Sequence, residues 1–234
     1  MDFSDPLFWT ALAKIIGVNI VLSGDNAVVI ALAARSLPPQ QQRQAIFWGS
    51  GAAIVMRIVL TLFAVALLDI NWLKIVGSVL LLWIGVKLLA GDEEEGEDKI
   101  KGHDSMVAAV RTILIADLVM SLDNVIAVAA AAKGSTTLLV IGLAISIPLI
   151  IYASTLLIKL MERFPVIITI GAALIGWVAG EMAWEDKAIE AFTSQFPRWL
   201  EYVVAAICAG LVIAVGRYLA KSAASSTATK SKAS

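Results

Sequence analysis

The stretch "NIVLSGDNAVVIALAA" at residues 19–34 aligns without a gap with the stretch "DLVMSLDNVIAVAAAA" at residues 117–132. Both are apolar along most of their length, and both carry an aspartate followed by an asparagine near the middle. An ionised carboxylate at the centre of a membrane helix costs about 2.5–3.5 kcal/mol on insertion scales. A chain that carries this cost twice needs a reason for both copies.

The composition of the chain predicts a membrane protein. Its 234 residues are 59% hydrophobic and only 16% charged, whereas soluble domains have about a quarter charged residues. The apolar residues form continuous runs of about twenty, which is the length of a helix that crosses a bilayer, and they lack the alternation of a barrel strand. We therefore expect an all-α polytopic fold with seven transmembrane helices, at 7–33, 45–68, 71–90, 106–132, 137–159, 165–184 and 199–220.

The basic residues predict the orientation of these spans. If the N-terminus is outside, twelve of the 18 Lys and Arg residues fall in cytoplasmic segments and four in outer segments, while Lys14 and Arg57 lie within spans. Cytoplasmic loops carry the excess of Lys and Arg, so we predict an outer N-terminus and a cytoplasmic C-terminus. The opening "MDFSDPLFW" is acidic and lacks the basic region of a cleavable signal, so the first span is expected to be retained.

The two halves of the chain resemble one another beyond the opening stretches. "GSVLLLW" at 77–83 matches "GAALIGW" at 171–177 in its glycine and tryptophan. Three spans are an odd number, so the second copy must be inverted, and inverted repeats place a substrate site between them near mid-membrane. We expect a first three-helix repeat at 1–90, an acidic cytoplasmic linker at 91–105, a second three-helix repeat at 106–184, an outer loop and seventh helix at 185–220, and a flexible polar tail at 221–234.

The charged residues outside the spans have mostly ordinary interpretations. The linker is expected to be a solvated acidic loop, and a metal-collecting loop around His103 is the alternative. The small polar residues of the tail predict disorder. Asp186, with the acidic residues beside it after span 165–184, is expected to be solvated, and lining an outer exit is the alternative.

Helical spacing places the polar residues of each motif together. One face of span 7–33 carries Asn19, Ser23 and Asn26. The equivalent face of span 106–132 carries Asp117, Ser121 and Asn124. In regular helices Asp25 and Asp123 would point about 100° to one side of these faces. A break in the helix would let the carboxylates join them, and Gly24 favours a break in the first motif, whereas Leu122 gives no comparable help in the second.

The candidate ligands are all oxygen atoms, which suit Mg²⁺, Ca²⁺ or Mn²⁺ and disfavour Cu(I) or Zn²⁺. Hydrogen bonds that hold the bundle together are the structural alternative, but three buried carboxylates with one arginine favour an ion or proton pathway. Arg57 is expected to be a counter-ion for one aspartate, with a gating role as the alternative. The predicted metal-binding residues are Asp25, Asn26, Asp117, Asp123, Asn124, Asn19, Ser23 and Ser121.

These features resemble the TerC family of integral membrane proteins. The resemblance rests on "SGDNAVVIAL" at 23–32, "DLVMSLDNVIAV" at 117–128, Arg57 and the three-plus-three-plus-one arrangement of spans. It implies a member of the larger LysE-like group of exporters, in the form of the bacterial members that consist of a membrane unit alone. It also implies manganese efflux, or manganese supply to exported enzymes, with the ion site at Asp25, Asn26, Asp117, Asp123 and Asn124.

We therefore expect a secondary transporter in the bacterial cytoplasmic membrane that exports a hard divalent cation, Mn²⁺ before others, with protons as a candidate coupling ion. The metal is then cargo, and neither a cofactor nor nucleic acid is expected. One alternative is an accessory membrane protein of metal or tellurite resistance, or of metalation of exported proteins, without transport of its own. A homo-oligomer and an association with protein-export machinery stay open, as does an exporter of amino acids. An enzyme is not expected, because the motifs lack the Tyr-Asp and Gly-x-Gly-Asp patterns of intramembrane aspartyl proteases.

Overall fold

The structure, a computed structural model, describes residues 6–21, 24–63, 67, 70–91, 102–132 and 136–233. Within these residues the fold is helical, and six helices are long and apolar enough to cross a membrane, which confirms the predicted class. The helices are α1 (Pro6–Val21), α2 (Gly24–Ala34), α3 (Pro39–Leu62), α5 (Leu73–Ala90), α6 (Gly102–Ala132), α7 (Thr136–Arg163), α8 (Val166–Trp184), α9 (Glu190–Thr193) and α10 (Trp199–Ala233).

The predicted spans and the observed helices differ most at the first span. Two helices, α1 and α2, stand where one span at 7–33 was expected, and each is shorter than the roughly 20 residues that cross a bilayer. Helix α3 begins at Pro39, six residues before the predicted span, because proline fits the first turn of a helix where its missing N–H is not needed. Helix α3 is assigned as far as Leu62, six residues before the predicted end of its span at 68. The spans at 71–90, 106–132, 137–159 and 165–184 agree with their helices to within four residues, and the last span differs only at its end.

The C-terminal tail differs from its prediction. Composition indicated a disordered segment at 221–234, but α10 continues to Ala233. The tail follows a long formed helix, so it needs only propagation and not a new nucleus. Four of its residues are alanine, the residue with the highest helix propensity. The linker at 91–105 lies outside the described residues from 92 to 101, and the side chain of His103 does too.

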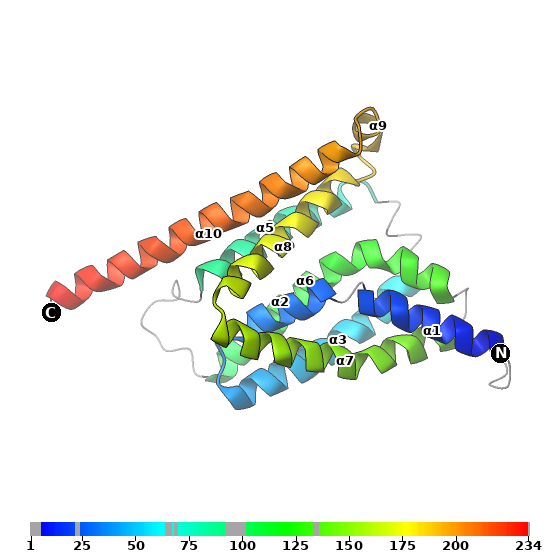
Figure 1. Cartoon of the computed structure of the whole chain (residues 1–234), viewed down its shortest axis with the longest axis horizontal. Helices are drawn as coiled ribbons and strands as arrows, with labels where there is room; N and C mark the ends of the chain where they lie inside the picture. The colour runs from blue at the N-terminus through cyan, green and yellow to red at the C-terminus, as the bar shows by residue number, and fades with distance from the viewer. Residues whose placement is uncertain are drawn as a thin grey trace.

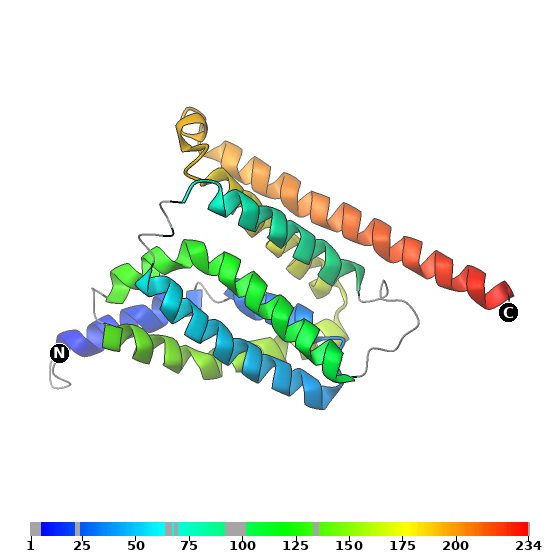
Figure 2. The same ribbon diagram turned by 180° about the vertical axis from the view of Figure 1, so that it is seen from behind.

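The helices are arranged in two layers (Figures 1 and 2). A three-helix layer consists of α5, α8 and α10, which all pack against one another. A five-helix layer consists of α1, α2, α3, α6 and α7. The layers meet where α5 packs against α6 and where α8 packs against α2 and α7. The start of α1 and the end of α10 lie at opposite ends of the bundle (Figure 1).

Close packing stabilises the three-helix layer, and a hydrogen bond connects it to the five-helix layer. In the three-helix layer, a Cβ on Gly180 would lie 2.5 Å from Cα of Ala205 in α10, so a small residue is needed there, as is common between membrane helices. Between the layers, Nη2 of Arg35 after α2 donates to the carbonyl of Leu88 in the last turn of α5 at 2.9 Å. A cation at that position also suits the negative end of the helix dipole.

Large apolar side chains are exposed on the outside of both layers. A soluble protein rarely exposes contiguous apolar patches of this kind, whereas lipid contact favours them. Examples from different helices are Trp48, Val55, Val76, Tyr152, Ile170, Ile207 and Leu211, each at least 46% exposed. The molecule is therefore an integral membrane protein with a lipid-facing surface.

Candidate functional site

The first motif lies at the start of α2. Helix α1 ends at Val21 and α2 begins at Gly24, and residues 22 and 23 between them lie outside the described residues. Asp25 falls in the first turn of α2 and its Oδ1 accepts a hydrogen bond from the backbone N–H of Asn26 at 2.8 Å. A carboxylate at this position is stabilised by the positive end of the helix dipole. The second motif lies in α6, which is assigned as one continuous helix from Gly102 to Ala132.

A buried ion pair connects the second motif to α3. Nη2 of Arg57 lies 2.6 Å from Oδ1 of Asp117, and Nε of Arg57 donates to Oγ of Ser121 at 3.1 Å. Ser121 in turn donates to Oδ2 of Asp117 at 3.2 Å. The three residues are at most 6% exposed. The arginine thus contacts two residues one helical turn apart on α6, as the i, i+4 spacing allows.

The ion pair explains how these charges are tolerated within the bundle. Isolated charges in a medium of low dielectric constant are very costly, and a buried pair is acceptable only when its remaining polar atoms are hydrogen-bonded. Here both carboxylate oxygens and two guanidinium nitrogens are engaged. Arg57 is therefore the counter-ion of Asp117, as the structural interpretation of this residue predicted.

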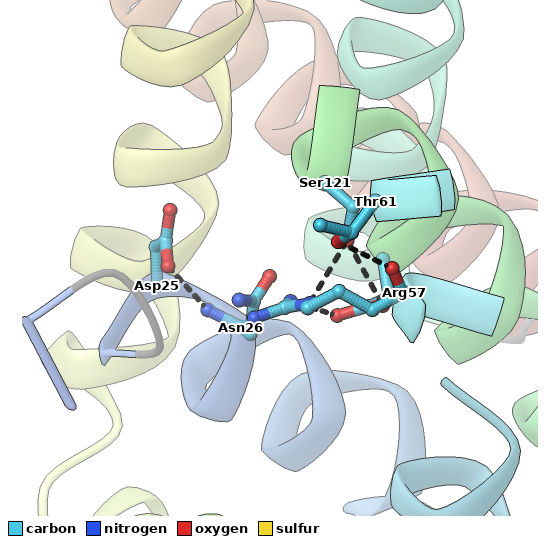
Figure 3. A network of polar contacts seen from close by, with 6 residues as sticks. Asp25, Asn26, Arg57, Thr61 and Ser121 are labelled. Atoms are coloured by element: carbon cyan, nitrogen blue, oxygen red, sulfur yellow. Dashed lines mark hydrogen bonds and ion pairs between the residues drawn. The ribbon is translucent and has the colours of Figure 1, made fainter. Parts of the chain in front are cut away.

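The first motif faces the same arginine. Figure 3 shows Asn26 between Asp25 and the guanidinium group of Arg57. Asn26 is 2% exposed, and Asp25 is half-buried. Asp25 also interacts electrostatically with both Arg57 and Asp117. Since α2 packs against α6, the two motifs join at one polar centre that contains two carboxylates and one guanidinium.

The structure describes some of the predicted site residues fully and others only in part. The structure brings together Asp25, Asn26, Asp117, Ser121 and Arg57, and it buries Asn124 in α6 at 8% exposure. Asn19 and Asp123 belong to α1 and α6, but their side chains lie outside the described residues, as does the whole of Ser23. Among the side chains that are described, no group of three or more His, Cys, Asp or Glu residues could hold a metal ion.

Two polar contacts were not predicted. Thr61 donates to the carbonyl of Arg57 at 2.7 Å, one turn earlier in α3, which is a common way to satisfy a buried threonine. Asp186 was expected to be solvated, and this prediction is wrong, since the residue is 1% exposed. Its Oδ1 accepts from the N–H groups of Trp72 and Ala188 at 3.1 and 2.7 Å, and its Oδ2 accepts from that of Ile75 at 3.1 Å.

Asp186 is buried because it caps α5 from a distant part of the chain. The first turn of a helix leaves N–H groups without partners, and α5 has no capping side chain of its own. Trp72, before its first residue, adopts a left-handed conformation with φ of 69°, which is unfavourable for a non-glycine residue. The bond to Asp186 holds it there. Burial alone would raise the pKa of this carboxyl, but the N–H groups of Ala188, Ile75, Trp72 and Lys74 outweigh it and lower the pKa.

Replacing Asp186 with alanine should destabilise the protein by about 1–3 kcal/mol, the cost of leaving buried donors without an acceptor. Thermal unfolding in detergent would measure the loss. Because the pKa of the folded state lies below the ordinary value of 3.8, this stabilisation is present at neutral pH and is lost as the pH falls through the lowered pKa. The deficit of the variant should therefore shrink in acid. Glu190→Ala, at an exposed position of the same connection, is the matched control and should change stability little.

Comparison with known proteins agrees with these features. The family model described as "Integral membrane protein TerC family" matches residues 4–224. The uncharacterized membrane protein YjbE of Bacillus subtilis is 46% identical over 185 residues, which is 79% of this chain and 84% of that protein.

More distant relatives are the uncharacterized membrane protein YceF of Bacillus subtilis and the UPF0053 inner membrane protein YoaE of Escherichia coli. YceF is 27% identical over 77% of this chain and 73% of its own length. YoaE is 26% identical over 94% of this chain but only 45% of its own length. No solved structure matches the chain. The resemblance noted in the motifs is confirmed, and the chain belongs to the TerC family of integral membrane proteins.

Proposed function

We propose that this protein is a secondary transporter of the bacterial cytoplasmic membrane that exports a hard divalent cation, with Mn²⁺ as the favoured substrate. The observation that carries the proposal is the buried centre where Arg57 bonds Asp117 and Ser121 beside Asp25 and Asn26. Ionisable residues this deep in a membrane protein mark ion or proton pathways far more often than they serve packing.

The proposed architecture is a 3+3 inverted repeat with one added helix. In it, α1 and α2 together form a discontinuous first span, α6 is its counterpart, and α3 and α5 correspond to α7 and α8. The packing supports this correspondence. The second span of the first repeat, α3, packs against α6, and its counterpart α7 packs against α1 and α2. The third span of the first repeat, α5, packs against α6, and its counterpart α8 packs against α2. Such a set of contacts is what a pseudo-two-fold axis between the repeats would give.

Two glycines that are equivalent in the repeat also make equivalent contacts. A Cβ on Gly77 in α5 would lie 2.7 Å from Val119 of α6. A Cβ on Gly171 in α8 would lie 2.8 Å from Val28 of α2. In each case the third span of one repeat approaches the motif helix of the other. Small residues at such crossings let membrane helices approach closely, and this similarity supports the inverted repeat.

The orientation that we propose has the N-terminus outside and the C-terminus in the cytoplasm. The positions of α1 and α10 at opposite ends of the bundle are compatible with it (Figure 1). The excess of Lys and Arg then lies in the cytoplasmic connections.

The chemistry of the centre suits a hard cation. Carboxylate, amide and hydroxyl oxygens are the ligands that Mn²⁺, Mg²⁺ and Ca²⁺ share. The proposed ligands are Asp25, Asn26, Asp117, Asp123 and Asn124, with Asn19, Ser23 and Ser121 as neighbours. Asp117 can bind a cation only when Arg57 releases it, so the arginine and the substrate would compete for one carboxylate. This exchange would keep the charge of the buried centre balanced, which reconciles the counter-ion and gating interpretations.

Purified protein in liposomes tests the proposal, with a Mn²⁺-sensitive dye inside. We expect Mn²⁺ flux without any partner protein, and a weaker response to Zn²⁺, which prefers nitrogen and sulfur ligands. Absence of flux for every divalent cation would instead favour an accessory role in metal resistance or in metalation of exported proteins. Inhibition of Mn²⁺ flux by amino acids would favour the larger substrates of other exporters. Flux with and without an imposed pH gradient tests proton coupling.

A further inference from the structure

A pocket lies between the two layers at the end of the bundle that carries α9. Its volume is about 300 Å³. Among the described residues, its lining comes from the connection between α3 and α5, the start of α5, the connection that follows α8, and Leu122 of α6. The lining residues are Leu67, Ile70, Leu73, Lys74, Leu122, Glu185, Asp186, Lys187 and Glu190. The pocket is therefore lined by both apolar and charged residues.

Leu122 belongs to the lining of this pocket and is next to the polar centre in the chain. It is 7% exposed, it lines the pocket, and it directly follows Ser121, which bonds both Arg57 and Asp117. Consecutive Cα atoms are 3.8 Å apart, so one residue that lines the pocket is the direct neighbour of a residue of the centre. A leucine side chain cannot bind an ion, and it bars hydrated cations as long as it fills this position.

Polar contacts fix several of the charged residues that line the pocket. Nζ of Lys74 lies 3.0 Å from Oε2 of Glu185, and the oxygens of Asp186 are engaged by backbone N–H groups. These contacts hold the start of α5 against the connection after α8. The part of the lining that belongs to the three-helix layer is thus linked by these contacts. Among the described residues, Leu122 is the lining residue that α6 provides.

We propose that this pocket is the outer vestibule of the ion path and that Leu122 is its hydrophobic gate, which opens when the two layers separate at this end. This inference rests on the proposed transport function. The two motifs differ at this very position, since Gly24 in the first motif is exposed and a Cβ there would meet none of the described atoms within 4 Å. The gate therefore belongs to the second motif only.

Cysteine accessibility tests the vestibule independently of transport. The single native cysteine is first removed as Cys208→Ala, and Leu122→Cys is then labelled with a membrane-impermeant cationic methanethiosulfonate. We expect labelling from the extracytoplasmic side at least about tenfold faster than at Leu211→Cys, an exposed position on the lipid-facing surface of α10, because thiols in apolar surroundings rarely ionise. Mn²⁺ should slow the labelling. Equal slow rates at both positions, or labelling only from the cytoplasmic side, would overturn the proposal.

Transport by size variants tests the gate. Leu122→Trp should reduce Mn²⁺ flux at least about tenfold by filling the path, and Leu122→Ala should increase it, whereas Leu211→Ala should leave it unchanged. Unaltered flux in both variants at position 122 would refute the gate. The two proposals fail separately. Labelling at Leu122→Cys without any metal flux in the parent protein would support an accessible pocket at this position but refute metal transport. Metal flux without labelling would support transport but refute the vestibule.

Discussion

Replacing Asp25 with asparagine should reduce Mn²⁺ flux into proteoliposomes by at least about 100-fold, because even residues that only support a metal ligand typically contribute 10–100-fold to affinity. The substitution keeps the size of the side chain and an oxygen that can accept the hydrogen bond from Asn26 N–H. It removes the charge and a favourable interaction with the start of α2, which is worth no more than about 1 kcal/mol. Flux and thermal unfolding, measured on the same preparation, separate transport from stability.

Glu162→Gln is the matched control for this variant. Glu162 is an exposed carboxylate in the last turns of α7, so its neutralisation removes the same charge without touching the polar centre. We expect normal flux and normal stability. Asp123→Asn should behave like Asp25→Asn if the second motif contributes equally to the site. Normal flux in both aspartate variants would refute the proposed ion path, whatever the stability of the proteins.

The features that sequence predicted best are those with a local physical cause. Runs of apolar residues locate the spans because helix length must match bilayer thickness. Gly24 marked the first motif as a place where a helix breaks more easily, because glycine weakens a helix from within, and α2 is assigned from this residue. The tail was mispredicted for the opposite reason. Polar composition argues against a packed core, but it does not prevent propagation from a preceding helix such as α10.

The features that sequence could not predict depend on partners far apart in the chain. Burial of Arg57 followed from its place in an apolar span, but the choice among three aspartates as its partner depends on how α3 packs against α6. Asp186 lies 114 residues from Trp72, and it accepts a hydrogen bond from the N–H group of that residue. One signal was available, since α5 lacks a capping residue of its own, and unsatisfied N–H groups must find an acceptor elsewhere.

Replacing Arg57 with methionine should destabilise the protein by about 3–5 kcal/mol, because it leaves the carboxylate of Asp117 buried without its counter-ion. Methionine keeps the unbranched apolar stem of arginine but is shorter, so a second variant is needed to separate the lost charge from a packing defect. Thermal unfolding in detergent at neutral pH would measure the loss of stability. Arg111→Met, at an exposed position of α6, removes a positive charge outside the buried centre and should change stability by less than about 0.5 kcal/mol.

The double variant Arg57→Met with Asp117→Asn distinguishes a lost ion pair from poor packing of the methionine. If the stranded charge causes the instability, neutralising Asp117 should restore most of the loss, and the two substitutions should be strongly non-additive. If the double variant regains stability but not Mn²⁺ flux, the ion pair serves transport rather than folding. A bundle without these charges can be stable, but arginine and substrate can then no longer compete for one carboxylate. Additive losses would instead assign Arg57 a packing role and remove the basis for that competition.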